Sequence, residues 1–181
     1  MASVYDVADF FIDFAKNDEN DTITNLRLNK LLFFAQAWHL VKYDTPLFND
    51  NIEAWDLGPV VPVIYQKYKD YKKNNIDSVS SGYSTSNFTS EEIDTLTEVI
   101  FFYGRYSTTE LVNQTHQENS PWKKVYEKGK NEVINKDSIK EYYSQLIPQS
   151  SYFTTPKWMY LDAETPKRNT QGVAIITEDW E

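Results

Sequence analysis

The chain has 181 residues, so one compact domain is the expected organisation, because independent domains commonly hold about 100 to 200 residues. Hydrophobic residues make up 40% and aromatic residues 15% of it, which is enough for a core and excludes long disorder as the main state. The absence of cysteine excludes disulfides, thiolate nucleophiles and cysteine-based metal sites. A formal net charge of -9 opposes direct nucleic-acid binding and favours a basic partner.

Neither a membrane span nor a targeting segment is predicted. The most apolar stretch, residues 31–41, contains Gln36 and His39 and is shorter than the roughly 18 to 20 apolar residues that cross a bilayer. The first residues lack the basic and apolar regions of a signal peptide. We therefore expect no membrane partner and a cytoplasmic location.

Capping residues predict two helices in the first quarter of the chain. Ser3 is the predicted N-cap of a helix through Ala15 with one apolar face. Thr24 is the predicted N-cap of a long helix that ends at about Tyr43. Because this second helix is apolar nearly all round, it is expected to have neighbours on several sides and to be the central helix.

The next stretch contains a short extended segment and a lysine-rich helix. Residues 51–57 are predicted to be extended, and Pro62 is expected at the first position of a helix through Tyr71. Four lysines lie in this helix or directly after it: Lys67, Lys69, Lys72 and Lys73. They form either a solvated helix face or a surface that contacts phosphate or an acidic partner. The polar stretch 74–88 is predicted to be a surface loop.

Four short helices are predicted after that loop. Thr89 with Glu92 is a capping box for a helix through Tyr103 that Gly104 closes, and Ser107 with Glu110 is a capping box for a helix to about His116. Pro121 takes the first position of the next helix, after Ser120. The last helix, residues 139–146, is expected to follow a cap at Asp137 or Ser138.

The character of the sequence changes after Pro148. Residues 157–161 and 172–177 resemble two strands, so residues 149–181 are expected to be either a small β addition or a segment that orders on a partner. The predicted organisation is a helical domain over residues 1–148 and a C-terminal extension over 149–181. The predicted fold class is a mainly α, compact domain of about seven helices with a minor β element.

The chain offers little material for catalysis. Its two histidines, His39 and His116, would have to meet a carboxylate such as Glu53 or Glu118 to form a metal or acid–base site. No metalloprotease, serine-hydrolase or phosphate-loop motif is present. We therefore expect a protein that is not an enzyme, with no metal and no cofactor; a small histidine-dependent enzyme stays open as an alternative.

Three groups of residues together carry a family resemblance. The first is Lys30, Gln36, Trp38 and His39 within the segment 28–40; the second is Ala54-Trp55, Gly58-Pro59-Val60 within 52–65; the third is Thr115-His116 and Pro121-Trp122 within 111–122. In this order and spacing they resemble the Panacea domain, also called SocA-like or GepA-type. The resemblance is collinear from about Val4 to about Leu146, and it has no counterpart for the C-terminal extension.

The resemblance implies a bacterial or phage antitoxin that neutralises an adjacently encoded toxin by direct protein contact. It also implies an alternative, a proteolytic adaptor that delivers its toxin to the ClpXP protease. An acidic phage protein that mimics nucleic acid is a further alternative, based on the charge. Hydrogen bonds from His39 and His116 to the segment 54–56 are expected to shape one surface groove for the toxin. The residues expected to bind the partner or shape this groove are Trp38, His39, Trp55, Gly58, Pro59, Thr115, His116, Pro121 and Trp122.

Overall fold

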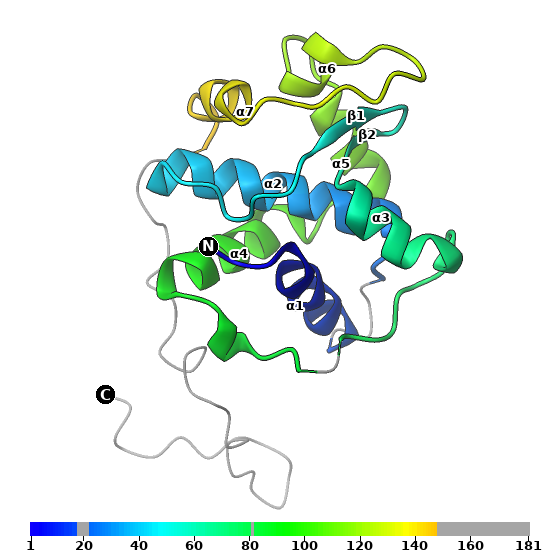
Figure 1. Ribbon diagram of the computed structural model, residues 1–181, viewed down its shortest axis with the longest axis vertical. Coiled ribbons are helices and arrows are strands. Elements are labelled where there is room, and N and C mark those ends of the chain that lie inside the picture. The colour runs from blue at the N-terminus through cyan, green and yellow to red at the C-terminus, as the bar shows by residue number, and fades with distance from the viewer. Residues whose placement is uncertain (18–21, 81, 148–181) are drawn as a thin grey trace, which may run out of the picture.

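One long helix runs through the middle of the molecule, with the other elements on both sides of it (Figure 1). The computed structural model describes residues 1–17, 22–80 and 82–147. Helix α2 (Asn25–Tyr43) begins after Thr24, whose side chain accepts a hydrogen bond from the backbone N–H of Arg27. Sixteen of its 19 residues are buried, and it contacts helices α1, α3, α4, α5 and α7 and strand β2. The prediction of a central helix is confirmed.

Five helices pack directly on α2, α6 packs on α7, and the described part of the chain is mainly helical, as predicted. Helices α4 and α5 begin with the predicted capping boxes, in which Thr89 pairs with Glu92 and Ser107 pairs with Glu110. The helices are α1 (Val4–Lys16), α3 (Pro62–Tyr68), α4 (Ser90–Tyr103), α5 (Thr108–Thr115), α6 (Pro121–Val125) and α7 (Lys136–Tyr143), with short 3-10 turns η1 (Lys69–Tyr71) and η2 (Thr85–Asn87).

Two details of the helix ends differ from the sequence-based expectation. Helix α7 is capped by Asn135, whose side chain accepts a hydrogen bond from the backbone N–H of Asp137 at 2.7 Å; the predicted caps, Asp137 and Ser138, are therefore wrong. Gly104 closes α4 with φ -58° and ψ -35°, which is right-handed helical geometry and not the left-handed cap typical of glycine.

The minor β element is a hairpin in the first half of the chain. Strands β1 (Glu53–Trp55) and β2 (Gly58–Val60) pair antiparallel with Trp55 opposite Gly58. A third stretch joins at β1, where the N–H of Ala54 donates to the carbonyl of Glu132 at 2.8 Å. The hairpin includes part of the segment 51–57 that was predicted to be extended. The strands predicted at 157–161 and 172–177 lie outside the described residues.

Buried polar side chains of α2 hold the connecting segments in place. Gln36 accepts hydrogen bonds from the N–H groups of Leu47 and Phe48 at 3.0 and 3.2 Å, and donates to the carbonyl of Phe48 at 3.2 Å. Asn29 accepts from the N–H of Val61 at 2.8 Å. Each bond satisfies a polar group that would be costly to bury alone.

Two residues in the first turn of α2 make further side-chain to backbone bonds. Arg27 donates to the carbonyls of Gly104, at 2.6 Å, and Tyr106. Asn25 donates to the carbonyl of Tyr65 at 3.0 Å. Side chains of α2 therefore bond to the backbone at the junction between β2 and α3 and in the turn between α4 and α5.

None of the helices in the described part of the chain is both long enough and apolar enough to cross a membrane.

Candidate functional site

The β hairpin is tied to the rest of the molecule by a stack of three aromatic rings. The indole N–H of Trp122 donates to the carbonyl of Trp55 at 2.9 Å. His116 stacks on Trp122, with 3.7 Å between ring centroids, and Tyr126 also stacks on it with 4.4 Å. The hydroxyl of Tyr126 then donates to Asp56 at 3.0 Å. The segment 54–56 is thus held from α6, with His116 acting through its ring contact with Trp122.

At Gly58 the hairpin lies very close to the helices. The φ of Gly58, +102°, is unfavourable for any residue with a side chain. A Cβ atom at this position would lie 2.7 Å from the hydroxyl of Thr115 and 3.0 Å from the Cε atom of Lys30. The next carbonyl, that of Pro59, accepts a hydrogen bond from the Nζ atom of Lys30 at 2.8 Å. Only glycine lets β2 approach α2 and α5 this closely.

Lys30 is a fully buried lysine beneath the hairpin. It makes no ion pair with a carboxylate of the residues that the structure describes, and burial lowers its pKa to about 7. Burial also lowers the pKa of His116, with smaller contributions from Lys30 and Lys123 in the same direction. A buried cation without a carboxylate is costly, so the hydrogen bond to Pro59 is its main compensation.

Two of the predicted site residues lie apart from this cluster. His39 is nine residues further along α2 than Lys30, about 13 Å at 1.5 Å per residue. Its Nδ1 atom is 3.0 Å from the hydroxyl of Thr95 on α4, and its Nε2 atom is 3.5 Å from that of Thr45. Trp38 packs against Phe102 on α4, with ring centroids 4.8 Å apart. The predicted hydrogen bond from His39 to the segment 54–56 is therefore wrong.

The positions of the two histidines bear on the alternative of a histidine-dependent enzyme. His39 contacts α4, whereas His116 caps the C-terminus of α5 beside Trp122, so the two rings do not form one acid–base pair. Burial lowers the pKa of His39 to about 4, and Glu92 opposes this shift only in part. The ring is therefore neutral at pH 7. The described residues contain no group of three or more His, Asp or Glu side chains that would hold a metal.

The seven other predicted residues meet around the hairpin, and most of them are buried. Trp122 is 4% exposed, and Gly58, Pro59, Thr115 and Pro121 are also buried. Only Trp55 and His116 are half-exposed. The buried motif residues therefore support the hairpin from beneath, whereas Trp55, the turn that follows it and His116 remain partly accessible.

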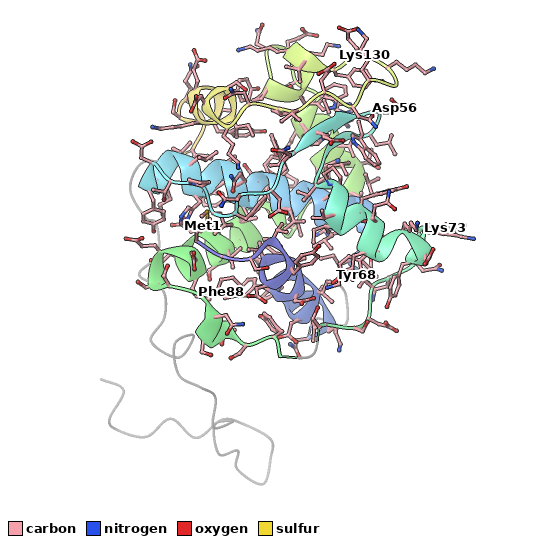
Figure 2. The ribbon with its side chains drawn as sticks, viewed as in Figure 1. Met1, Asp56, Tyr68, Lys73, Phe88 and Lys130 are labelled. Carbon is pink, nitrogen blue, oxygen red and sulfur yellow. The ribbon has the colours of Figure 1, made fainter. Side chains whose placement is uncertain are left out.

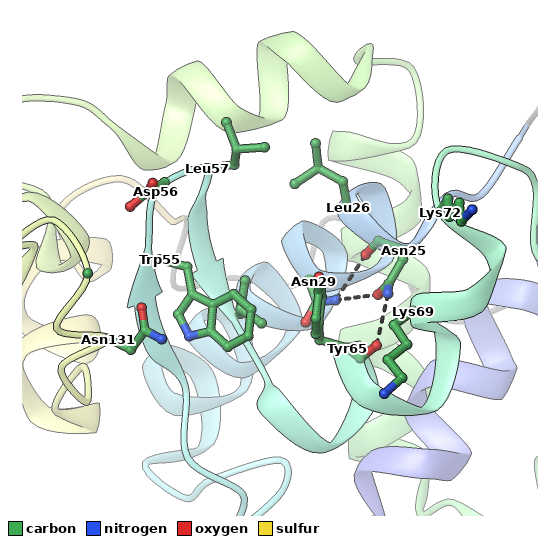
Figure 3. Close-up of a pocket in the computed structure, with 12 residues that line it drawn as sticks. Asn25, Leu26, Asn29, Trp55, Asp56, Leu57, Tyr65, Lys69, Lys72 and Asn131 are labelled. Carbon is green, nitrogen blue, oxygen red and sulfur yellow. Dashed lines mark hydrogen bonds between the residues drawn. The ribbon is translucent and has the colours of Figure 1, made fainter.

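An open pocket of about 430 Å³ lies beside the hairpin (Figure 3). The hairpin and Asn131 line one side, and the first turn of α2 with α3 and η1 lines the other. Figure 3 shows the ring of Trp55 between these two sides. The lining residues are Asn25, Leu26, Asn29, Trp55, Asp56, Leu57, Val60, Tyr65, Lys69, Lys72, Gly129 and Asn131.

The inner wall of this pocket is fixed by a chain of hydrogen bonds. The amide of Asn29 donates to the side-chain oxygen of Asn25 at 2.9 Å, and Asn25 donates to the carbonyl of Tyr65 at 3.0 Å. The ring of Tyr65 meets that of Trp55 edge to face, 4.8 Å between centroids. The indole N–H of Trp55 donates to Glu53 at 2.9 Å. This wall is preformed, as ligand-binding sites usually are.

Apart from Trp55, the sequence-based site residues did not include the lining of this pocket. A signal was present for Asn25 and Asn29, since two amides four residues apart on an apolar helix lie on one face of it. For Tyr65 there was no such signal, because its approach to Trp55 depends on how α3 packs on the hairpin.

The comparisons with known proteins point to one family. The model of the family described as "Antitoxin SocA-like, Panacea domain" matches residues 28–123, which contain every predicted site residue. The chain is 34% identical over 111 residues to the antitoxin SocA of Caulobacter vibrioides (strain NA1000 / CB15N), a match that covers 55% of this chain. The match spans 58% of the length of that relative. No solved structure matches the chain.

Proposed function

Because the chain belongs to the family of SocA-like antitoxins with a Panacea domain, we propose that it is the antitoxin of a toxin–antitoxin pair. It binds an adjacently encoded toxin directly and neutralises it by holding it in a complex. The family membership supports the antitoxin role, and the geometry of the hairpin supports this element as the surface that contacts the toxin.

The observation that carries this assignment is the supported hairpin. The buried ring of Trp122 fixes the backbone at Trp55, and Gly58 lets the hairpin lie close to the helices. The turn then presents Leu57, which is 57% exposed, beside the half-exposed indole of Trp55. A rigid backbone that carries an exposed aliphatic and an aromatic side chain is typical of the anchor points of protein interfaces.

The charge of the chain suits a basic toxin at long range. With a net charge of -9, the chain attracts a positively charged partner, which raises the rate of encounter. This attraction acts between whole molecules and does not set which groups touch in the complex. The toxin is therefore proposed to be basic overall.

The test is growth of cells that express the neighbouring reading frame, with and without this protein. We expect the neighbour alone to stop growth, and wild-type protein to restore it and to co-purify with the neighbour as a defined complex. Trp55→Ala is expected to weaken the complex at least about tenfold, as truncation of an aromatic anchor does. Phe101→Ala is the matched control, because Phe101 is an exposed aromatic residue, at 55%, on α4.

Three outcomes would each contradict a part of the proposal. If the product of the neighbouring reading frame does not stop growth, the proposal of a toxin–antitoxin pair is wrong. Folded Trp55→Ala protein that restores growth and binds as well as the Phe101→Ala control would remove the hairpin from the interface. Growth that recovers because the neighbour is degraded, and that is lost when ClpXP is absent, would replace sequestration with proteolytic delivery.

A further inference from the structure

We propose that the pocket beside the hairpin binds an acidic segment of the partner protein. A bulky apolar side chain of that segment enters the pocket, and its flanking carboxylates pair with Lys69 and Lys72. The identity of the partner as a toxin rests on the proposed function, whereas the chemistry of the segment follows from the pocket itself.

Charge is distributed unevenly over this acidic chain. The segments 67–73 and 123–130 carry eight of its 18 basic residues and only two acidic residues, Asp70 and Glu127. The pocket lies between the first segment and the loop that follows the second. In Figure 2, Lys73 and Lys130 lie along the same edge of the molecule as Asp56 at the hairpin tip. Lysines are therefore concentrated at this edge, although the chain as a whole is acidic.

Some of these cations are already engaged, and the two that line the pocket are not. Lys67 donates to the hydroxyl of Ser80 at 2.7 Å, and Lys130 pairs with Glu127. Lys69 and Lys72 line the pocket, are exposed, and form no ion pair with the residues that the structure describes. Their ammonium groups are thus free to meet carboxylates of a partner.

The acidic residue of the pocket itself does not cancel these charges by direct contact. Asp56 lies with Trp55 and Asn131 on the hairpin side of the pocket, opposite Lys69 and Lys72 (Figure 3). One oxygen of Asp56 accepts the hydrogen bond from the hydroxyl of Tyr126.

The interior of the pocket favours a side chain over a phosphorylated small molecule. Leu26, Leu57 and Val60 line it together with the rings of Trp55 and Tyr65. The indole N–H of Trp55 is already donated to Glu53, and the amides of the two lining asparagines bond within the wall. Few donors and acceptors are left for the edges of a base, whereas an apolar side chain needs none.

The rim of the pocket is held in unusual backbone conformations. Lys72 has φ 54° with ψ -114°, Asn131 has φ 51° and Gly129 has φ 78°. A non-glycine residue with positive φ costs free energy and persists where surrounding structure requires it. The rim is therefore set before binding, which reduces the entropy lost when a partner segment is ordered on it.

The test uses the full chain and three synthetic nine-residue peptides. Each peptide has a central residue flanked by four charged residues on each side: phenylalanine between glutamates, phenylalanine between lysines, and alanine between glutamates. Binding is followed by NMR of ¹⁵N-labelled protein in low salt. We expect the first peptide to shift the signals of Trp55, Leu57, Tyr65 and Asn131, and each of the other two to bind at least about tenfold more weakly.

Two charge-reversal variants separate the pocket from the overall charge. Lys69→Glu/Lys72→Glu is expected to weaken binding of the first peptide at least about tenfold. Lys16→Glu/Arg105→Glu is the control, since it reverses two charges at the end of α1 and after α4, away from the pocket, and gives the same net charge. Equal binding by both variants overturns the proposal.

Two further outcomes overturn it as well. The first is equal affinity for the glutamate and lysine peptides, or no binding of any of the three. The second is binding of ATP or inorganic phosphate, but of no peptide, at Lys69 and Lys72, which would make the site one for a small anion. Peptide binding does not depend on the neighbouring gene, so a harmless neighbour would contradict the antitoxin role and leave the pocket's chemistry standing. A toxin that binds both charge variants equally well would leave the antitoxin role standing and would contradict the pocket as the site that this toxin uses.

Discussion

Trp122 donates its indole N–H to the carbonyl of Trp55, 2.9 Å away across 67 residues of sequence. The bond joins the second and third motif groups, and it uses the backbone of Trp55 and leaves the indole of that residue to line the pocket. One tryptophan therefore holds the hairpin, and the other is presented by it.

Trp122→Phe is expected to loosen the hairpin without unfolding the domain. The substitution keeps a stacking ring but removes the donor of one hydrogen bond, and the net contribution of such a bond is about 0.5 to 1.5 kcal/mol. Urea denaturation should report a loss of stability of this size, and amide hydrogen exchange should rise at residues 53–60. Trp38→Phe is the control, because the indole N–H of Trp38 makes a long hydrogen bond, 3.4 Å, to the hydroxyl of Tyr103. Equal exchange in both variants would contradict the role of the Trp122 bond.

Gly58→Ala is expected to destabilise the protein by about 3 kcal/mol or more. The new side chain suffers from the positive φ, which costs about 1 to 2 kcal/mol, and its Cβ atom would also overlap the hydroxyl of Thr115 at 2.7 Å. Gly82→Ala is the control, since Gly82 also has a positive φ, +90°, and a Cβ atom added there would meet none of the described residues within 4 Å. Thermal or urea unfolding of both variants isolates the overlap. Equal losses at the two sites would show that the close approach of β2 to α5 is unimportant for stability.

Lys30 is expected to make stability rise with pH above neutrality. Its pKa is about 7 in the folded protein and ordinarily 10.5, so between these values the unfolded chain holds a proton that the folded chain has released. Stability therefore increases with pH across this window, by up to about 1.4 kcal/mol per pH unit. Below pH 7 both states are protonated, and the full cost of burying the cation remains.

Lys30→Met is the variant that measures this contribution. Urea denaturation at pH 7.5 and 9.5 should give a smaller rise in stability for Lys30→Met than for wild type, because methionine has no proton to release. Lys16→Met, at an exposed position, should keep the wild-type dependence. A Lys30→Met protein with the wild-type rise would mean that another group carries it.

The starts of the helices could be read from the sequence where the capping side chain and its target are close neighbours. Thr89 and Ser107 each bond a backbone group three residues on, so the pattern is local. The start of α7 could not be read in this way, because Asn135, Asp137 and Ser138 are all suitable caps. The choice follows from Ile134, which is buried and donates its N–H to the carbonyl of Ile52, 82 residues earlier.

Part of the candidate site could also be predicted from the sequence, and the rest depends on long-range packing. The motifs singled out Trp55 and Trp122 because their spacing matches a family, and these residues do meet. The partner of His39, Thr95, is 56 residues away on a helix whose packing the sequence does not specify. The sequence shows Lys30 as a lysine in an apolar stretch of helix. Its complete burial depends on the packing of Gly58 and Thr115 against it, which the sequence does not specify.

The polar side chains of α2 reach backbone atoms, and this has a consequence for how the protein changes over evolutionary time. Asn29, Lys30 and Gln36 bond the backbone N–H or C=O groups of residues 47, 48, 59 and 61. Bonds of this kind do not depend on which side chain the connecting segment carries. Mutations at exposed positions beside these residues, such as Leu57, can therefore alter the surface while the helix continues to hold the same backbone, so a new binding specificity can arise without a new fold.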